Sequence, residues 1–360
     1  MKKLLSVLTA VMILLSAVFG ANTVNAKNDK VQMLPVMSAE SKQPDRVWVG
    51  TFQLVWNEFA DNIIKGPVLF KDGTPEVAKQ LNRQSFKKSM LSEDSYYTAY
   101  GKTTLELKKQ IEDAIMAKFN ETSDILDKID WEDPNNAYLI YSMLKKDFNY
   151  TTRFDILAKE KFNNSKTKYE YFGIDEKNND RDNDGVKVLF YNNPFDYAVA
   201  LQAEKDEVIL YRTNSNNNFK SVYEDINKKA AKYKGSKTFV KGDKLKVPFI
   251  TLKEETNYKE LCGHEILNTD RLYIGQALNT VDFNMNNTGI KLKSEAAMSI
   301  MKMSLVIPQK LKGRNFYFNN TFILFLKEKD KSMPYYAMRV QDMESVSYTH
   351  LRAHETEADL

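Results

Sequence analysis

The sequence predicts an α+β fold, in which helices pack on mainly antiparallel and mixed β-sheets. Two observations predict this class. Helical and extended segments occur in blocks along the chain, first helices, then strands, one more helix and further strands, without regular alternation. No repeat of fixed period is visible, so the sequence does not predict a solenoid or a propeller.

The helical segments are recognised by the spacing of their apolar residues. Leu105–Phe119 carries apolar residues on one face at helical spacing and charged residues on the others. Phe219–Tyr233 has the same spacing with a lysine-rich outer face, and Val47–Ile64 mixes aromatic and acidic residues that can also form a helix.

The strands are predicted from short apolar runs bounded by turn residues. Ala137–Leu144 is almost continuously apolar, which fits a strand buried on both faces or, alternatively, a short core helix. Val186–Tyr191, Tyr197–Leu201 and Val208–Tyr211 are separated by polar turns and predict a three-stranded antiparallel meander.

The first residues predict export. Lys2 and Lys3 precede an apolar run from Leu4 to Phe19, and small residues ending at Ala26 suit a signal peptidase. A membrane anchor is the alternative, but the run is short for a span of roughly 20 residues. We therefore expect residues 1–26 to be a signal peptide and the mature protein to be secreted, extracellular and free of the membrane. Residues 27–46 are polar and are expected to be a flexible segment.

The last residues look foreign to the protein. The stretch from Ser347 to Thr356 resembles a translated sequencing adapter, so residues 346–360 are interpreted as a non-native tail and residues 47–345 as one domain. Without that tail, His264 is the only histidine, which disfavours histidine triads and multi-histidine metal sites. Cys262 is the only cysteine, so no intrachain disulfide is expected.

Composition and motifs exclude several classes of function. The 52 basic and 48 acidic residues give a net charge of +4 without an arginine-rich block, so a nucleic-acid partner is not expected. The sequence lacks Gly-x-Ser-x-Gly, a phosphate-binding glycine loop and His-Glu-x-x-His. We predict no catalytic residues, no cofactor and no enzymatic activity, with an extracellular hydrolase as the weakest alternative. Abundant Lys, Asn, Ile and Tyr suggest an AT-rich bacterial genome.

Three small constellations have a functional and a structural interpretation. Asp180, Asp182 and Asp184 before a glycine match the start of a calcium loop, but the twelfth position is Tyr191, which favours a solvated acidic turn over a weak calcium site. Cys262 and His264 could form a nucleophile pair, although a two-residue separation on a helix points their side chains apart. The three tryptophans are expected to pack in the core; they are Trp48, Trp56 and Trp131.

The segment after Gly289 alternates with period two. Ile290, Leu292, Ser294, Ala296, Met298 and Ile300 form one face, which is mainly apolar, and mostly polar residues form the other. Such a segment can become a strand with one face buried and the other in water. An ordinary amphipathic edge strand or a helix of the core is the alternative.

Four segments, in their order along the chain, resemble the serpin superfamily. Leu272–Gly289 matches the serpin hinge strand "LYVSKVVHKAFIEVNEEG" without a gap. Lys246–Tyr258, which would lead into a helix from Tyr258 to Ile266, resembles an earlier serpin strand, and Phe318–Leu326 and Tyr336–Val340 resemble the closing hairpin strands. The resemblance implies a divergent secreted bacterial serpin with an exposed reactive-centre loop.

The resemblance also assigns residues to that loop. It makes Gly289, Ile290, Leu292, Ser294 and Ala296 the loop hinge. The spacing of inhibitory serpins places the scissile bond at Met303-Ser304. Serpin hinges normally consist of small residues, so the bulky Ile290 and Leu292 are expected to slow the opening of the sheet.

The resemblance implies a secreted inhibitor of serine or cysteine proteases that acts by loop cleavage and strand insertion. Its partner would be an extracellular protease, and the inhibitor itself would be a monomer. A non-inhibitory serpin-like extracellular binding protein is the alternative, which the bulky hinge and a shortened N-terminal half favour.

Overall fold

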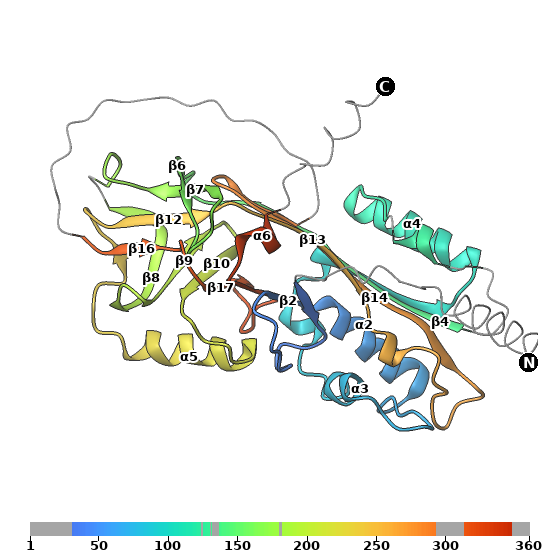
Figure 1. Cartoon of the computed structure of the whole chain (residues 1–360). Coiled ribbons are helices and arrows are strands. Elements are labelled where there is room, and N and C mark those ends of the chain that lie inside the picture. Colours follow the sequence, from blue (N-terminus) through green and yellow to red (C-terminus); the bar gives the residue numbers. More distant parts are fainter. Residues whose placement is uncertain are drawn as a thin grey trace, which may run out of the picture. The chain divides into compact units, whose positions relative to one another are not determined.

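In this computed structural model, the described residues are 31–123, 125–129, 131, 137–179, 182–292 and 313–347, and they fall in one compact unit (Figure 1). The predicted signal peptide, residues 1–26, lies outside them. The α+β class is confirmed, because three sheets with parallel and antiparallel pairs are combined with few helices.

The largest sheet has eight strands, which pair antiparallel except for the two at its N-terminal edge. In spatial order they are β1 (Gln32–Leu34), β2 (Arg46–Val49), β18 (Tyr336–Val340), β17 (Phe322–Glu328), β10 (Asp206–Arg212), β9 (Asp196–Gln202), β8 (Asn183–Asn193) and β11 (Thr238–Phe239). The antiparallel pairing of β8 with β9 and of β9 with β10 confirms the predicted meander.

Two further sheets complete the fold. The four-stranded sheet consists of β16 (Asn315–Tyr317), β12 (Lys244–Pro248), β7 (Lys168–Ile174) and β6 (Asp155–Lys161). The six-stranded sheet consists of β3 (Tyr96–Lys102), β4 (Ala137–Leu144), β14 (Tyr273–Met285), β15 (Gly289–Leu292) and β5 (Lys146–Asn149), with β13 (Ile250–Asn257) on the other edge of β14. Ala137–Leu144 is therefore a strand, not a helix.

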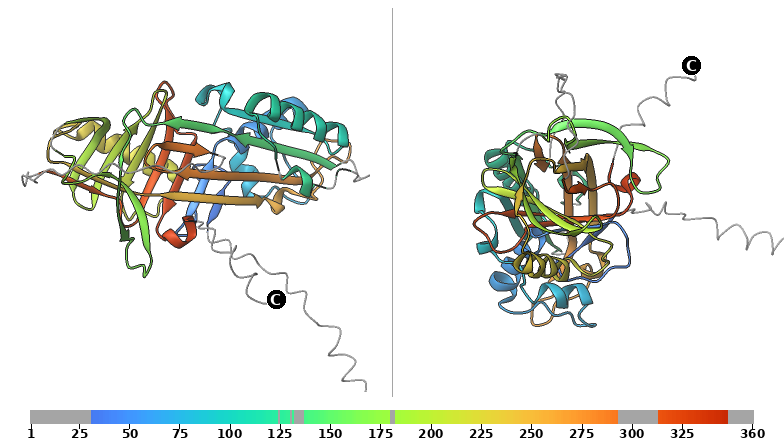
Figure 2. Two further views of the ribbon diagram at one scale, coloured as in Figure 1. Left: turned by 90° about the horizontal axis from the view of Figure 1, so that it is seen from above. Right: turned by 90° about the vertical axis from the view of Figure 1, so that its left-hand side faces the viewer.

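Helices lie on both faces of the six-stranded sheet and beside the largest one (Figures 1 and 2). The α-helices are α2 (Thr51–Phe59), α3 (Glu76–Leu81), α4 (Leu105–Phe119), α5 (Phe219–Lys232) and α6 (Met343–Val346), and a π-helical turn, Ala60–Ile64, continues α2. Single 3₁₀ turns occur at Lys88–Met90, Glu93–Ser95, Leu126–Lys128 and Lys259–Leu261. The helices predicted at Leu105–Phe119 and Phe219–Tyr233 are confirmed. Thr104 caps α4 by accepting a hydrogen bond from the Leu107 amide at 3.1 Å.

Strand β4 separates two apolar cores by the alternation of its side chains. Its odd-numbered residues contact α4 in a small core, whose members include Ile111, Ile115, Leu139, Tyr141, Met143 and Leu278. Ile140 belongs to the main core, which also contains Trp48 and Trp56; Trp131 is buried in the small one. The prediction of packing roles for the tryptophans is confirmed.

Two boundaries and one element differ from the sequence predictions. The segment predicted to be flexible is ordered from residue 31, since β1 pairs with β2 and Val31, Leu34 and Val36 are buried. The excluded tail begins too early, because Val346 on α6 is fully buried. Only a single 3₁₀ turn replaces the helix expected from Tyr258 to Ile266, since that segment forms bridges to the start of β14.

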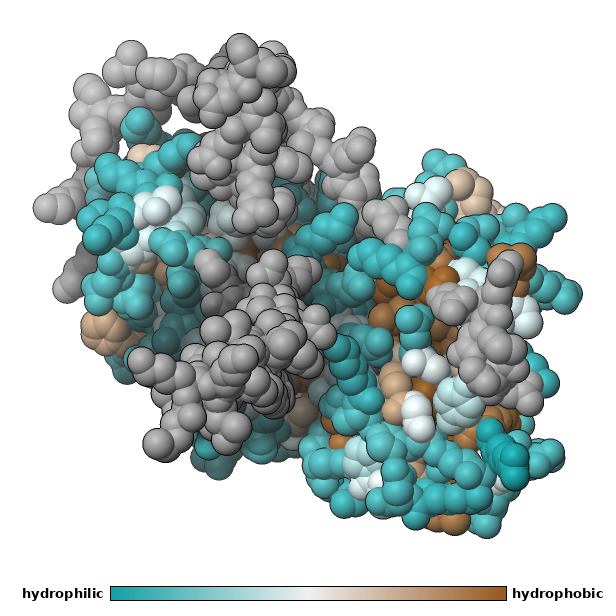
Figure 3. Space-filling model, turned by 45° about the vertical axis from the view of Figure 1, so that its right-hand side comes forward, coloured by the Kyte–Doolittle hydropathy of each residue, from teal (hydrophilic) through white to brown (hydrophobic). Residues whose placement is uncertain are grey.

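The surface offers no broad apolar face in the view of Figure 3, where hydrophilic side chains predominate and apolar ones form separate patches. The most exposed large apolar side chains of the described residues are Phe195 on the β8–β9 turn and Leu105 on α4. No helix in the described ranges combines the length and apolarity needed to cross a bilayer.

Candidate functional site

The candidate site is the end of the six-stranded sheet at which β15 lies. Strands β4 and β5 follow each other along one side of this sheet, and β14 lies on the other side (Figure 2). The space between β14 and these two strands is called the gap below; β15 fills it at one end. At one end β14 pairs directly with β4 in parallel, from Tyr273 opposite Ala137 to Ala277 opposite Ile140. At the other end β15 lies between β14 and β5, antiparallel to both.

A tight turn brings the chain from β14 back into the sheet as β15. The side-chain oxygen of Asn286 accepts hydrogen bonds from the Thr288 amide at 2.8 Å and from the Gly289 amide at 3.3 Å. Such local bonding by asparagine stabilises a reversal of the chain. A Cβ on Gly289 would lie 2.0 Å from the Phe148 carbonyl oxygen, so only glycine fits where β15 passes β5.

The described part of the predicted hinge is already a strand. Ile290 pairs with Met285 and Phe148, and Leu292 pairs with Phe283 and Lys146. Ile290 is fully buried in the main core. The bulky Ile290 is therefore accommodated in the sheet, while the slower opening expected from bulky hinge residues stays a prediction. Ser294, Ala296 and the predicted scissile bond Met303-Ser304 lie outside the described residues.

Beyond Leu292 the two edges of the gap carry buried polar groups. Ser142 on β4 and Asn279 on β14 are 4% and 1% exposed. The Ser142 hydroxyl and both amide atoms of Asn279 lack a hydrogen-bond partner within the described part of the chain. Burial raises the pKa of the neighbouring Tyr258 hydroxyl, which also lacks a hydrogen-bond partner among the described residues. Unpaired buried polar groups cost stability, so this stretch of the sheet is not optimised as it stands.

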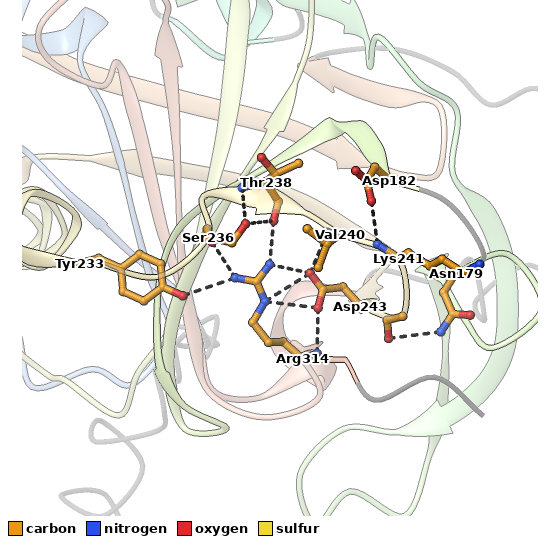
Figure 4. Close-up of polar contacts among 10 residues, drawn as sticks. Asn179, Asp182, Tyr233, Ser236, Thr238, Val240, Lys241, Asp243 and Arg314 are labelled. Carbon is orange, nitrogen blue, oxygen red and sulfur yellow. Dashed lines mark hydrogen bonds and ion pairs between the residues drawn. The ribbon is translucent and has the colours of Figure 1, made fainter. Parts of the chain in front are cut away.

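Where the described chain resumes after residue 312, Arg314 lies just before β16 and is fixed by several hydrogen bonds (Figure 4). Its guanidinium donates to both carboxylate oxygens of Asp243, from Nε at 3.2 Å to each and from Nη2 at 2.6 Å to one. It also donates to the Ser236 and Thr238 carbonyls, at 2.7 Å each. The backbone amide of Arg314 donates to Asp243 at 2.8 Å as well.

The ion pair of Arg314 with Asp243, called the Arg314 clamp below, favours the charged form of the arginine. Asp243 is 1% exposed, so its carboxylate needs a cationic partner. Burial alone would lower the pKa of Arg314, but the hydrogen bonds and attraction of Asp243 outweigh burial and raise it. The sequence analysis missed this pair, because 71 residues separate its members and no local spacing connects them.

The calcium candidate lies only partly within the described residues. Asp180 lies outside the described residues, and Asp182 accepts a hydrogen bond from the Lys241 amide at 2.9 Å. The described residues contain no group of three or more side chains that could hold a metal ion.

Cys262 and His264 each contact another residue, in keeping with the sequence argument against a nucleophile pair. His264 contacts the Asp72 carboxylate at 2.6 Å, and the Cys262 thiol lies 3.5 Å from the Tyr258 carbonyl. Burial raises the pKa of Cys262 to about 11, which leaves it protonated at neutral pH.

Solved structures show which fold this arrangement is. The serpin from the trematode Schistosoma haematobium is 14% identical, with 86% of this chain and 96% of that chain covered and a TM-score of 0.51. The described chain has the serpin fold. Serpin48 of the insect Tenebrio molitor (12% identity, 83% and 92% covered) and human thyroxine-binding globulin with thyroxine (8%, 82% and 98%) give TM-scores of 0.48 and 0.45. No family model matches the sequence, and no curated protein matches it.

Proposed function

We propose that this chain is a secreted serpin-type inhibitor of serine or cysteine proteases, which acts by loop cleavage and strand insertion. The observation that carries the proposal is β15: the segment directly after Gly289 forms a sheet strand between β14 and β5. The order of charged, apolar and small residues at positions 1–26 supports export. An extracellular protease is the proposed partner of a monomeric inhibitor.

The ladders of β15 define where an inserting strand would go. Leu292 pairs with Phe283 on one side and with Lys146 on the other. Continuing this register by four residues would place Ala296 between Ser142 and Asn279. The small alanine side chain suits a position between two buried residues. An inserted strand would also bring backbone donors and acceptors next to β4 and β14 at this position.

Insertion of two further residues would require two paired strands to separate. The same register would place Met298 between Ile140 and Ala277, which now pair directly with each other. Strand addition there requires β4 and β14 to separate by one strand spacing, about 4.8 Å. The Arg314 clamp fixes the chain just before β16. A cut between β15 and Arg314 would therefore free the chain after β15 to move into the sheet.

A non-inhibitory extracellular binding protein is the second candidate. The observation that favours it is the small core under α4, in which Leu278 of β14 packs with Leu139 and Tyr141 of β4. This packing holds the two strands together where insertion must part them. If insertion is slower than deacylation, the protease is released and the loop is simply cleaved.

A covalent band on denaturing gels tests the proposal. We expect the mature protein to form an adduct with at least one of several serine proteases, and a protease with its catalytic serine blocked should give none. Cleavage of the loop by every active protease, with no adduct, would support the non-inhibitory alternative.

A pair of proline variants tests insertion within the same loop. Ala296→Pro removes a backbone donor from a position that would enter the sheet, so we expect cleavage without an adduct. Gln309→Pro, downstream of the predicted scissile bond, should leave adduct formation intact. Equal adduct yields from both variants would contradict insertion beyond β15.

A further inference from the structure

Strand β5 carries a buried charge cluster that the sequence analysis did not identify. The Lys146 ammonium lies 3.2 Å from Asp206 on β10 and 2.5 Å from Glu328 on β17. All three side chains are nearly inaccessible, at 11%, 6% and 3% exposure. A lysine of the six-stranded sheet is thus fixed between two carboxylates of the eight-stranded sheet.

Hydrogen bonds from three more groups complete the cluster. Tyr335 donates its hydroxyl to Asp206 at 3.0 Å, and its ring lies 5.2 Å from the Lys146 ammonium. The backbone and hydroxyl of Ser92 donate to Glu328 at 3.0 and 2.7 Å. Burial raises the pKa of Asp206, with Lys146 opposing the shift and the Glu328 charge adding slightly to it.

The position of Lys146 is what gives the cluster a role. Lys146 is the residue of β5 that pairs with Leu292, the last residue of β15. Two residues earlier on the same edge β4 ends, and near its start that strand pairs directly with β14. The cluster therefore fixes β5 at the position where β15 separates it from β14.

A buried ion pair is weak evidence for stability but a well-attested way to fix position. A shift of β5 toward β14 would change the distances from Lys146 to two carboxylates on another sheet and disturb the pairing of buried charges, which is costly. An apolar side chain would tolerate such a shift, since dispersion contacts have no preferred direction. The cluster thus resists closure of the gap more strongly than apolar packing would.

We propose that Lys146, Asp206 and Glu328 hold the six-stranded sheet open at β15, with Lys146 as a positioning residue for loop docking. The inference deepens the proposed function and rests on it only in treating β15 as the first part of the inserting strand. The experiment below contains no protease, so its failure is distinguishable from a failure to trap one.

Hydrogen exchange of the full chain tests the proposal. In Lys146→Met, we expect amides in residues 286–292 to exchange about tenfold faster, relative to amides of β9 (Asp196–Gln202), because β15 leaves the sheet more often. Lys146→Arg keeps the charge and should restore the protection. An unchanged ratio between the two segments would overturn the proposal, since a purely structural lysine lowers protection everywhere.

The neighbouring lysine offers a matched control. Lys145 is on the opposite face of the same strand edge, where its ammonium donates to the Phe119 carbonyl at the end of α4 and contacts Glu121, at 2.9 Å each. Lys145→Met should leave exchange at 286–292 unchanged. Faster exchange there in both variants would show a general loosening of β4 and β5, which contradicts a specific role for Lys146.

Loss of folding in Lys146→Met would not leave the question open. A triple variant, Lys146→Met with Asp206→Leu and Glu328→Met, removes all three charges together, and such replacements are often neutral or stabilising. We expect it to fold and still to exchange faster at 286–292. A folded triple variant with wild-type protection there would refute the proposal.

Discussion

The chain enters and leaves the stretch between β15 and β16 at two points that are fixed by different interactions. The upstream end, β15, is held by main-chain pairing on both sides and by the burial of Ile290. The downstream end is held mainly through one side chain, the Arg314 guanidinium, and its buried partner Asp243.

This difference has a mechanical consequence. Main-chain pairing is largely independent of side-chain identity, so a ladder can be extended residue by residue where neighbouring edges are available. A guanidinium that binds one carboxylate and two carbonyls fits a single geometry and cannot move along the chain. Under the proposed mechanism, the chain after β15 would extend its ladder into the sheet, whereas the chain at Arg314 would stay in place.

Cleavage between the ends should have the largest effect. A single cut near Met303-Ser304 is expected to raise the melting temperature strongly, because Met298 and Ile300 would become buried at roughly 1.5–3 kcal/mol each. Thermal unfolding of intact and cleaved protein measures this. A cleaved form that melts at or below the intact temperature would show that the upstream end cannot extend.

Removal of the downstream partner should have the next largest effect. Asp243→Ala leaves Arg314 without its carboxylate and is expected to cost about 3 kcal/mol of unfolding free energy. Denaturant titration measures the loss, which should be the same after cleavage if the downstream end stays in place. Asp330→Ala, which removes an exposed partner of Lys331, is the control and should cost no more than about 0.5 kcal/mol.

Shortening a buried side chain of β15 should have a smaller effect on stability. Ile290→Val removes one buried methylene group and is expected to cost about 1 kcal/mol. Since Ile290 is in the sheet before any cut, intact and cleaved proteins should lose equal amounts in the same titration. A loss confined to the cleaved form would mean that β15 docks only after cleavage.

The smallest effect is expected at Cys262. This residue bridges to Ile274 at the closed end of the gap, on the side of β14 away from β4. With a pKa of about 11, its thiol should react slowly with iodoacetamide at pH 7 and faster as the pH rises toward 11. Cleavage should leave this rate unchanged, and a large increase would show that opening disturbs both sides of β14.

Local pattern predicted much of the fold. The helix at Leu105–Phe119 follows from periodicity, and the apolar run Ala137–Leu144 fitted a strand better than a helix; the structure has both elements with the same bounds. The strand at Tyr336–Val340 was implied by the serpin resemblance and also has the same bounds. The helix from Tyr258 to Ile266, which the serpin resemblance implied, is wrong, because this segment pairs with the start of β14 instead.

For the candidate site, too, local pattern predicted the strand-forming segment but not its position in the sheet. The period-two pattern after Gly289 was enough to predict a strand-forming segment there. Its place between β14 and β5 depends on residues about 140 positions away, so no local signal contains it.

The sequence by itself determined the α+β class, the principal helices and strands, and the capacity of the segment after Gly289 to form a strand. These features depend on side-chain periodicity, which is a property of neighbouring residues. Only the tertiary structure decided that β15 is already in the sheet, that Arg314 binds Asp243, and that Lys146 lies between Asp206 and Glu328. Each of these joins residues distant in sequence, and their energies come from burial and geometry that exist only once the sheets have packed.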